Sequence, residues 1–91
     1  MPGKKRPKHV AVRLRKVLAA NVVRRMEERY KNNGDMKKAL AESAGVTLST
    51  IQRVTQPERY DNGATIDTID QVAKALRCEP SDLLKDDHIA L

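Results

Sequence analysis

Apolar residues recur at helical spacing along most of this chain, in runs separated by glycine, proline and capping residues. The longest run steps by four residues: Leu14, Leu18, Val22, Met26 and Tyr30. A stripe of this period, flanked by basic side chains, is typical of an amphipathic helix. We therefore expect a first helix from about Val10 to Lys31, which the Asn-Asn-Gly sequence at 32–34 ends.

Two shorter helices are expected next, one on either side of a glycine. Asp35 is suited to cap the first of them, because its carboxylate can accept from the free amides of the first turn. Gly45 then breaks the pattern, and Thr47 is suited to cap the second helix, whose buried side chains are expected to be Ile51 and Val54. Two short helices joined by a tight glycine-containing turn form a helix-turn-helix, here at about residues 36–55.

Two more helices are expected after a loop over residues 56–64. Thr65 is suited to cap the fourth helix, which has an apolar stripe: Ile66, Ile69, Val72, Ala73 and Leu76. Pro80 suits the first position of a short fifth helix. In that helix we expect Leu83 and Leu84 to pack inward.

These elements predict one all-α domain of five helices. A chain of 91 residues is long enough for one core and too short for two. We expect the domain over residues 10–85, a disordered basic arm over residues 1–9 and a frayed tail over residues 86–91. The arm carries four basic residues: Lys4, Lys5, Arg6 and Lys8.

The net charge of +6 is unevenly distributed along the chain. Residues 1–31 hold eleven Lys and Arg against two acidic residues, whereas residues 61–91 hold three against seven. A basic end of this kind favours a polyanionic partner, although a solvated, solubilising surface would have the same composition. Charge alone leaves both readings open.

Several other classes of protein lack support in the sequence. Cys78 is the single cysteine, so no internal disulfide can form, and we find no secretory signal and no apolar run long enough for a membrane span. His9, His88 and Cys78 lack the close spacing of a zinc site, and no catalytic constellation is visible. We therefore expect a cytoplasmic, nucleoid-associated protein that is not an enzyme and has no metal, cofactor or small-molecule substrate.

At the helix-turn-helix, the sequence resembles the lambda-repressor-like family, which includes phage repressors and Cro proteins. The matching stretch is LAESAGVTLSTIQRV, from Leu40 to Val54. Leu18–Val22 resembles the first helix of the family, and Thr65–Leu76 and Ser81–Leu84 resemble its last two. The resemblance implies a five-helix domain that binds double-stranded DNA, as a homodimer on a pseudo-palindromic operator.

The resemblance also implies which side chains read the bases. Leu48, Ser49 and Gln52 face the base edges of the major groove, and the carboxamide of Gln52 is suited to pair bidentately with adenine. Arg53 is expected to reach a guanine or a phosphate. Two other interpretations stay open: Leu48 as an exposed leucine or one at the edge of the core, and Arg53 as a solvated charge or one paired with Glu42 or Glu58.

A second group of residues is expected to contact the DNA backbone. The group consists of Lys37, Thr47, Thr50, Arg59, Tyr60 and Asn62. Lys37 stands where the family commonly has a phosphate-binding glutamine, and Thr47 caps the helix that enters the groove. The basic arm is expected to wrap the duplex or enter its minor groove. Lys37 has the alternative of a solvated surface charge.

The chain departs from the family at two positions. The loop after Val54 is longer than usual and carries Pro57 where a glycine is common, which weakens the carry-over of contacts to Arg59–Gly63. Arg77 occupies a position that the family often gives to glycine, which costs stability if that residue is left-handed.

The function that we predict is sequence-specific regulation of transcription, by a phage-type or bacterial repressor. An alternative is an antitoxin-like interaction module that binds a toxin and its own promoter. Binding of RNA through the basic arm is a third hypothesis. Proteins bind single-stranded RNA by stacking bases on aromatic side chains, and this chain has only two tyrosines and no other aromatic residue, which makes the hypothesis less favourable.

Overall fold

The computed structural model describes residues 8–31, 34–60 and 63–86, and within them every regular element is helical. The elements are α1 (Lys8–Arg29), α2 (Met36–Ala44), α3 (Leu48–Thr55), the 3₁₀ helix η2 (Pro57–Arg59), α4 (Ile66–Ala75) and α5 (Pro80–Leu83). The predicted all-α class with five α-helices is therefore confirmed. The 3₁₀ turn η2 lies in the stretch that was expected to be a loop, and Pro57 occupies its first position.

The helix α1 starts earlier than expected. It begins at Lys8 rather than near Val10, so Lys8 and His9, which we assigned to the arm, have helical backbone. The other arm residues, Lys4, Lys5 and Arg6, lie outside the described residues, as do 87–91 of the expected tail.

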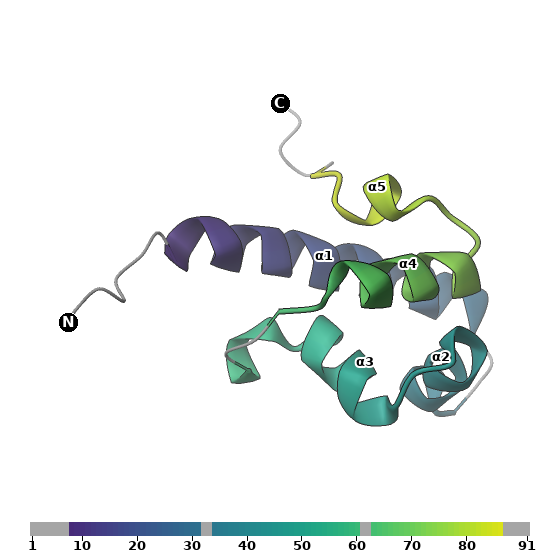
Figure 1. Ribbon diagram of the computed structural model, residues 1–91. Helices are drawn as coiled ribbons and strands as arrows, with labels where there is room; N and C mark the ends of the chain where they lie inside the picture. The colour runs from purple at the N-terminus through teal and green to yellow at the C-terminus, as the bar shows by residue number, and fades with distance from the viewer. Residues whose placement is uncertain (1–7, 32–33, 61–62, 87–91) are drawn as a thin grey trace.

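The five helices pack around one core (Figure 1). The long α1 contacts α2, α3 and α5, while α4 packs against α2 and α5. The largest buried apolar side chains come from every α-helix: Leu18, Val22, Met26, Leu40, Ile51, Val54, Val72, Leu76 and Leu83. Both α2 and α3 contribute side chains to this core. The angle between these two helices is therefore fixed by the packing of the core that holds the whole domain.

The predicted caps form at two helix starts. The side chain of Asp35 accepts a hydrogen bond from the Lys38 amide at 3.2 Å, which caps α2. The hydroxyl of Thr65 accepts from the Thr68 amide at 3.1 Å, which caps α4. Each bond satisfies a backbone donor that has no partner within its own helix.

Three leucine and isoleucine side chains are more exposed than their positions in the stripes suggested. Ile66, expected on the inner face of the fourth helix, is 83% exposed, and Leu84, expected to pack inward, is 41% exposed. Leu14 in the stripe of α1 is 51% exposed. Helical side chains lean toward the N-terminus, so Ile66 at the first position of α4 points beyond the helices on which α4 packs.

No helix in the described ranges is both long enough and apolar enough to cross a membrane.

Candidate nucleic-acid interface

The turn between α2 and α3 is closed by two backbone hydrogen bonds around Gly45. This glycine has φ of 74°, in the left-handed region, and its amide donates to the Glu42 carbonyl at 3.3 Å. The amide of Val46 donates to the Ala41 carbonyl at 3.0 Å, and its side chain packs against the core. This is the Schellman arrangement, in which a glycine avoids the steric cost of positive φ. The predicted tight turn at Gly45 is therefore present.

The start of α3 is fixed by two threonines. Thr47 has extended backbone, and its hydroxyl accepts from the Thr50 amide at 3.1 Å. The two hydroxyl oxygens lie 2.9 Å apart and share one hydrogen bond. The pair has two hydroxyl hydrogens and uses one between them, so the other is available to an outside acceptor such as a phosphate oxygen.

The exposed face of α3 carries three of the four residues that were expected to read bases. Leu48 and Ser49 in its first turn are exposed, and Gln52 one turn later is half-buried. The opposite face is formed by Ile51 and Val54, which are 0% and 4% exposed. Leu48 itself is 39% exposed. The helix thus presents Leu48, Ser49 and Gln52 on the side opposite its buried residues.

Arg53 and Tyr60, both expected at the interface, are brought together. The guanidinium carbon of Arg53 lies over the Tyr60 ring, 5.7 Å from its centroid. Glu58, one of the two expected partners of Arg53, lies instead 3.9 Å from Lys16 on α1. The charge on Arg53 thus meets the face of an aromatic ring, in cation–π geometry.

Arg15 on α1 is a residue of this region that sequence reasoning missed. Its guanidinium donates to the Tyr60 carbonyl at 3.3 Å. A Cβ added at Gly63 would meet the Nε of Arg15 at 3.2 Å, so Gly63 also lies against the Arg15 side chain. The sequence placed Arg15 on a basic flank of the first helix, and nothing in the helical period shows which flank faces a distant loop.

The remaining predicted contacts lie on neighbouring elements or outside the described residues. Lys37 is half-buried in the first turn of α2, which packs directly against α3. Arg59 is exposed at the end of η2, next to Tyr60. Asn62 lies outside the described residues.

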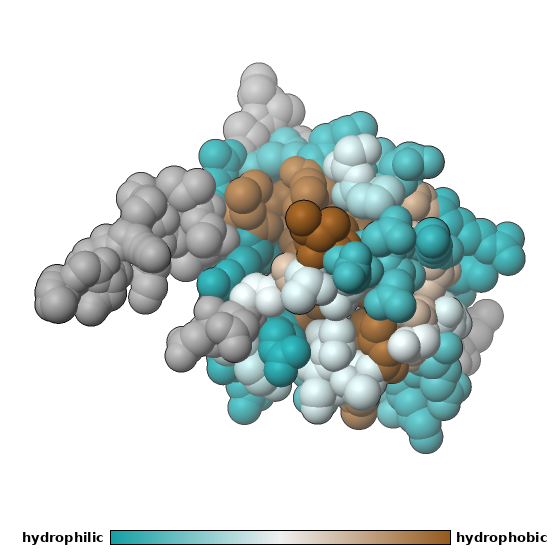
Figure 2. Space-filling model, in the orientation of Figure 1, coloured by the Kyte–Doolittle hydropathy of each residue, from teal (hydrophilic) through white to brown (hydrophobic). Residues whose placement is uncertain are grey.

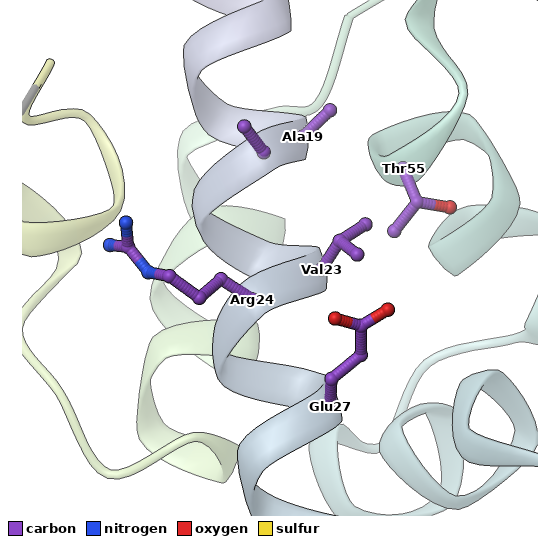
Figure 3. Close-up of a pocket in the computed structure, with 6 residues that line it drawn as sticks. Ala19, Val23, Arg24, Glu27 and Thr55 are labelled. Atoms are coloured by element: carbon purple, nitrogen blue, oxygen red, sulfur yellow. The ribbon is translucent and has the colours of Figure 1, made fainter. Parts of the chain in front are cut away.

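A shallow groove runs between α1 and the end of α3. It is lined by Ala19, Ala20, Val23, Arg24, Glu27 and Thr55. Val23 and Glu27 point toward Thr55 across the groove, whereas Arg24 points away toward α5 (Figure 3). Thr55 donates its hydroxyl hydrogen to the Ile51 carbonyl at 2.8 Å, so its polar atom is engaged within α3. The groove therefore combines the apolar side chains of Ala19, Ala20 and Val23 with the carboxylate of Glu27. Within the described ranges, no group of three His, Cys, Asp or Glu residues is placed to hold a metal ion.

Comparison with known families identifies the arrangement. The family model of the Cro/C1-type HTH DNA-binding domain matches residues 25–88, a range that contains α2, α3, η2, α4 and α5. Searches of curated proteins and of solved structures gave no match.

Proposed function

Because the chain belongs to the Cro/C1-type HTH DNA-binding domain family, we propose that it is a sequence-specific repressor of transcription that lays α3 in the major groove. The observation that carries the proposal is the exposed face of α3, where Leu48, Ser49 and Gln52 stand opposite the buried Ile51 and Val54. A probe that reads bases must present polar side chains from a support that does not shift. Gln52 is suited to pair with adenine, and Ser49 can donate to or accept from several bases.

Backbone contacts set the position of α3 along the groove. We assign this role to Lys37 by charge and to Thr47 and Thr50 through the hydroxyl hydrogen that their mutual bond leaves available. Arg59, exposed beside α3, is assigned the same role. If about six phosphates are neutralised, the logarithm of affinity falls with the logarithm of salt concentration at a slope of about −5.

The partner that we propose on DNA is a second copy of the chain. Its support is the apolar surface that Figure 2 shows on one face of the molecule, together with the exposed apolar side chains of α1, α4 and the end of α5; α5 contacts both α1 and α4. Leu14, Ile66 and Leu84 are the large exposed apolar side chains of these elements. Arg13, which precedes Leu14 in the sequence, forms an ion pair with Asp86 at 2.7 Å, so both charge signs are present on this part of the surface. A twofold interface is self-complementary, and a rim with both signs satisfies that condition.

Selection of random duplexes by the purified protein, followed by gel-shift titration of the selected sequence, tests the proposal. We expect one recurrent motif with twofold symmetry and half-sites about 34 Å apart. Gln52→Ala should lose about 1–3 kcal/mol of discrimination at one base position, whereas Lys37→Ala should weaken all duplexes equally and make the salt slope shallower. Lys74→Ala, an exposed change on α4, is the control. Equal affinity for selected and random duplexes rejects the proposal.

A further inference from the structure

Tyr60 lies beneath Arg53, the one arginine among the residues of α3. The Arg53 guanidinium carbon lies 5.7 Å from the centroid of the Tyr60 ring. An aromatic face attracts the cation and leaves all five of its N–H donors unoccupied. A carboxylate partner would use two of those donors and neutralise the charge. The tyrosine therefore holds the arginine side chain while keeping it competent to bind an acceptor.

The backbone of Tyr60 is held in turn. Its carbonyl accepts from Arg15 of α1 at 3.3 Å, and its amide donates to the Pro57 carbonyl of η2 at 3.4 Å. The chain then passes Arg15 again at Gly63. The backbone that carries the ring is therefore bonded to both α1 and η2, and these two elements also contact each other. A support of this kind lowers the number of positions that a long side chain samples before binding.

We propose that Tyr60 is a positioning residue: its ring orders Arg53 for base recognition, and its hydroxyl is not needed. This inference rests on the proposed function, since it concerns how one side chain of the reading helix finds its base. It replaces the direct phosphate contact expected for Tyr60 from the sequence. Arg15 contributes by holding the Tyr60 backbone, so α1 supports recognition without contacting DNA through this residue.

Two variants separate the ring from the hydroxyl. Tyr60→Phe keeps the ring and removes the hydroxyl, whereas Tyr60→Leu keeps apolar bulk and removes the ring. Arg29→Ala is the matched control, because Arg29 lies over the Tyr30 ring at 5.8 Å in a similar contact on α1. Thermal unfolding of each variant confirms that the domain is folded before binding is compared.

The first measurement uses the free protein. A ring beneath Arg53 shifts the NMR signals of its side-chain protons upfield. We expect that shift in the wild type and in Tyr60→Phe, and its loss in Tyr60→Leu. Absence of the shift in the wild type overturns the inference whatever the protein binds.

The second measurement uses the duplex selected by the wild type and single-base variants of it. Arg53→Ala identifies the position that Arg53 reads. We expect Tyr60→Leu to lose about two- to fivefold discrimination there, at an unchanged salt slope, and to add nothing in the Arg53→Ala background. Tyr60→Phe and Arg29→Ala should stay within about twofold of the wild type.

Four results of the binding experiments contradict the inference. Equal losses in Tyr60→Phe and Tyr60→Leu point to the hydroxyl, and a uniform loss on all duplexes with a shallower salt slope points to a phosphate contact. If the Tyr60→Leu variant discriminates between bases as well as the wild type does, the inference is wrong, but the proposed function still holds. A wild type that selects no duplex rejects both.

Discussion

The side chain of Asn21 on α1 donates a hydrogen bond to the carbonyl oxygen of Leu83 at the end of α5, at 2.8 Å and across 62 residues of chain. The same amide nitrogen donates to the Lys85 carbonyl at 2.9 Å, and the Asn21 oxygen accepts from Arg24 at 3.1 Å. Asn21 is 1% exposed. A helix of four residues such as α5 has carbonyls without intrahelical partners, and Asn21 satisfies one of them from within the core.

Replacing Asn21 should therefore cost more stability than its size suggests. Asn21→Ala leaves the Leu83 carbonyl buried without its donor, so we expect the free energy of unfolding to fall by about 2–3 kcal/mol. Asn21→Asp has the right shape but no donor, and it should be at least as damaging. Urea titration measures both changes, with Lys74→Ala as the exposed control. A loss below about 0.5 kcal/mol in both variants would show that water replaces the amide.

Arg77 ends α4 in the conformation that Gly45 adopts at the end of α2. Its φ is 60°, its amide donates to the Lys74 carbonyl at 3.1 Å, and the Cys78 amide donates to the Ala73 carbonyl at 3.0 Å. This is a second Schellman arrangement, here with a side chain in the left-handed region. Arg77 therefore has the left-handed backbone for which the sequence predicted a cost in stability.

Arg77→Gly should raise stability. Removal of the Cβ relieves about 1 kcal/mol of strain, which corresponds to an increase in Tm of roughly 4–8 °C for a domain of this size. Arg77→Ala is the control, because it removes the same charge and keeps the Cβ. Calorimetry that gave equal increases for the two variants would attribute the effect to charge instead.

The sequence predicted local features well and long-range polar contacts poorly. Caps at Asp35 and Thr47 and the turn at Gly45 depend on neighbouring backbone groups, so residue type and spacing were sufficient to find them. Asn21 depends on where α5 ends, more than sixty residues away, which no local pattern encodes. The partner of Arg53 likewise depends on the path of the loop after α3, which the unusual Pro57 made uncertain.

The same distinction applies to the surfaces of the helices. Helical period identified the outward face of α3, because Ile51 and Val54 had to be buried together. It also assigned Ile66 to an inner face, and that prediction was wrong. Period gives the direction of a side chain around its helix, whereas burial also requires a neighbouring element at that height along the axis.

The start of α5 should weaken in acid. The Asp82 carboxylate accepts from the Glu79 amide at 3.1 Å and lies 3.5 Å from the Lys85 ammonium. The backbone hydrogen bond, followed by the nearby Lys85, lowers the pKa of Asp82 below its ordinary value of 3.8. The unfolded chain therefore binds this proton more readily than the folded one, so the stabilisation is complete above the ordinary value and is lost as pH falls through the lowered one.

Thermal unfolding of Asp82→Ala and wild type between neutral and acidic pH measures this contribution. We expect the difference in Tm to be largest at neutral pH and to shrink as the pH falls below about 4. The asparagine of Asp82→Asn can accept from the Glu79 amide but does not ionise, so the stabilisation from this hydrogen bond should not vary with pH. A constant difference between Asp82→Ala and wild type at every pH would be inconsistent with a charged cap.

Ile66 tests whether two copies meet through the exposed apolar side chains to which we assign the dimer contact, Leu14, Ile66 and Leu84. The side chain is 83% exposed in the single chain, so Ile66→Glu should change the free energy of unfolding by less than about 0.5 kcal/mol. If a second copy covers it on DNA, a buried carboxylate there is costly. Affinity for the full operator should then fall at least about tenfold, while affinity for an isolated half-site changes little.

A matched change separates this effect from simple repulsion by DNA. Gln71 is exposed on the same helix, and Gln71→Glu adds the same negative charge as Ile66→Glu. Gel-shift titration of both variants on full-site and half-site duplexes should show a loss confined to Ile66→Glu on the full site. Equal losses for the two variants, or a loss on the half-site as large as on the full site, would place the second copy at another surface, because in that case charge alone explains the weaker binding.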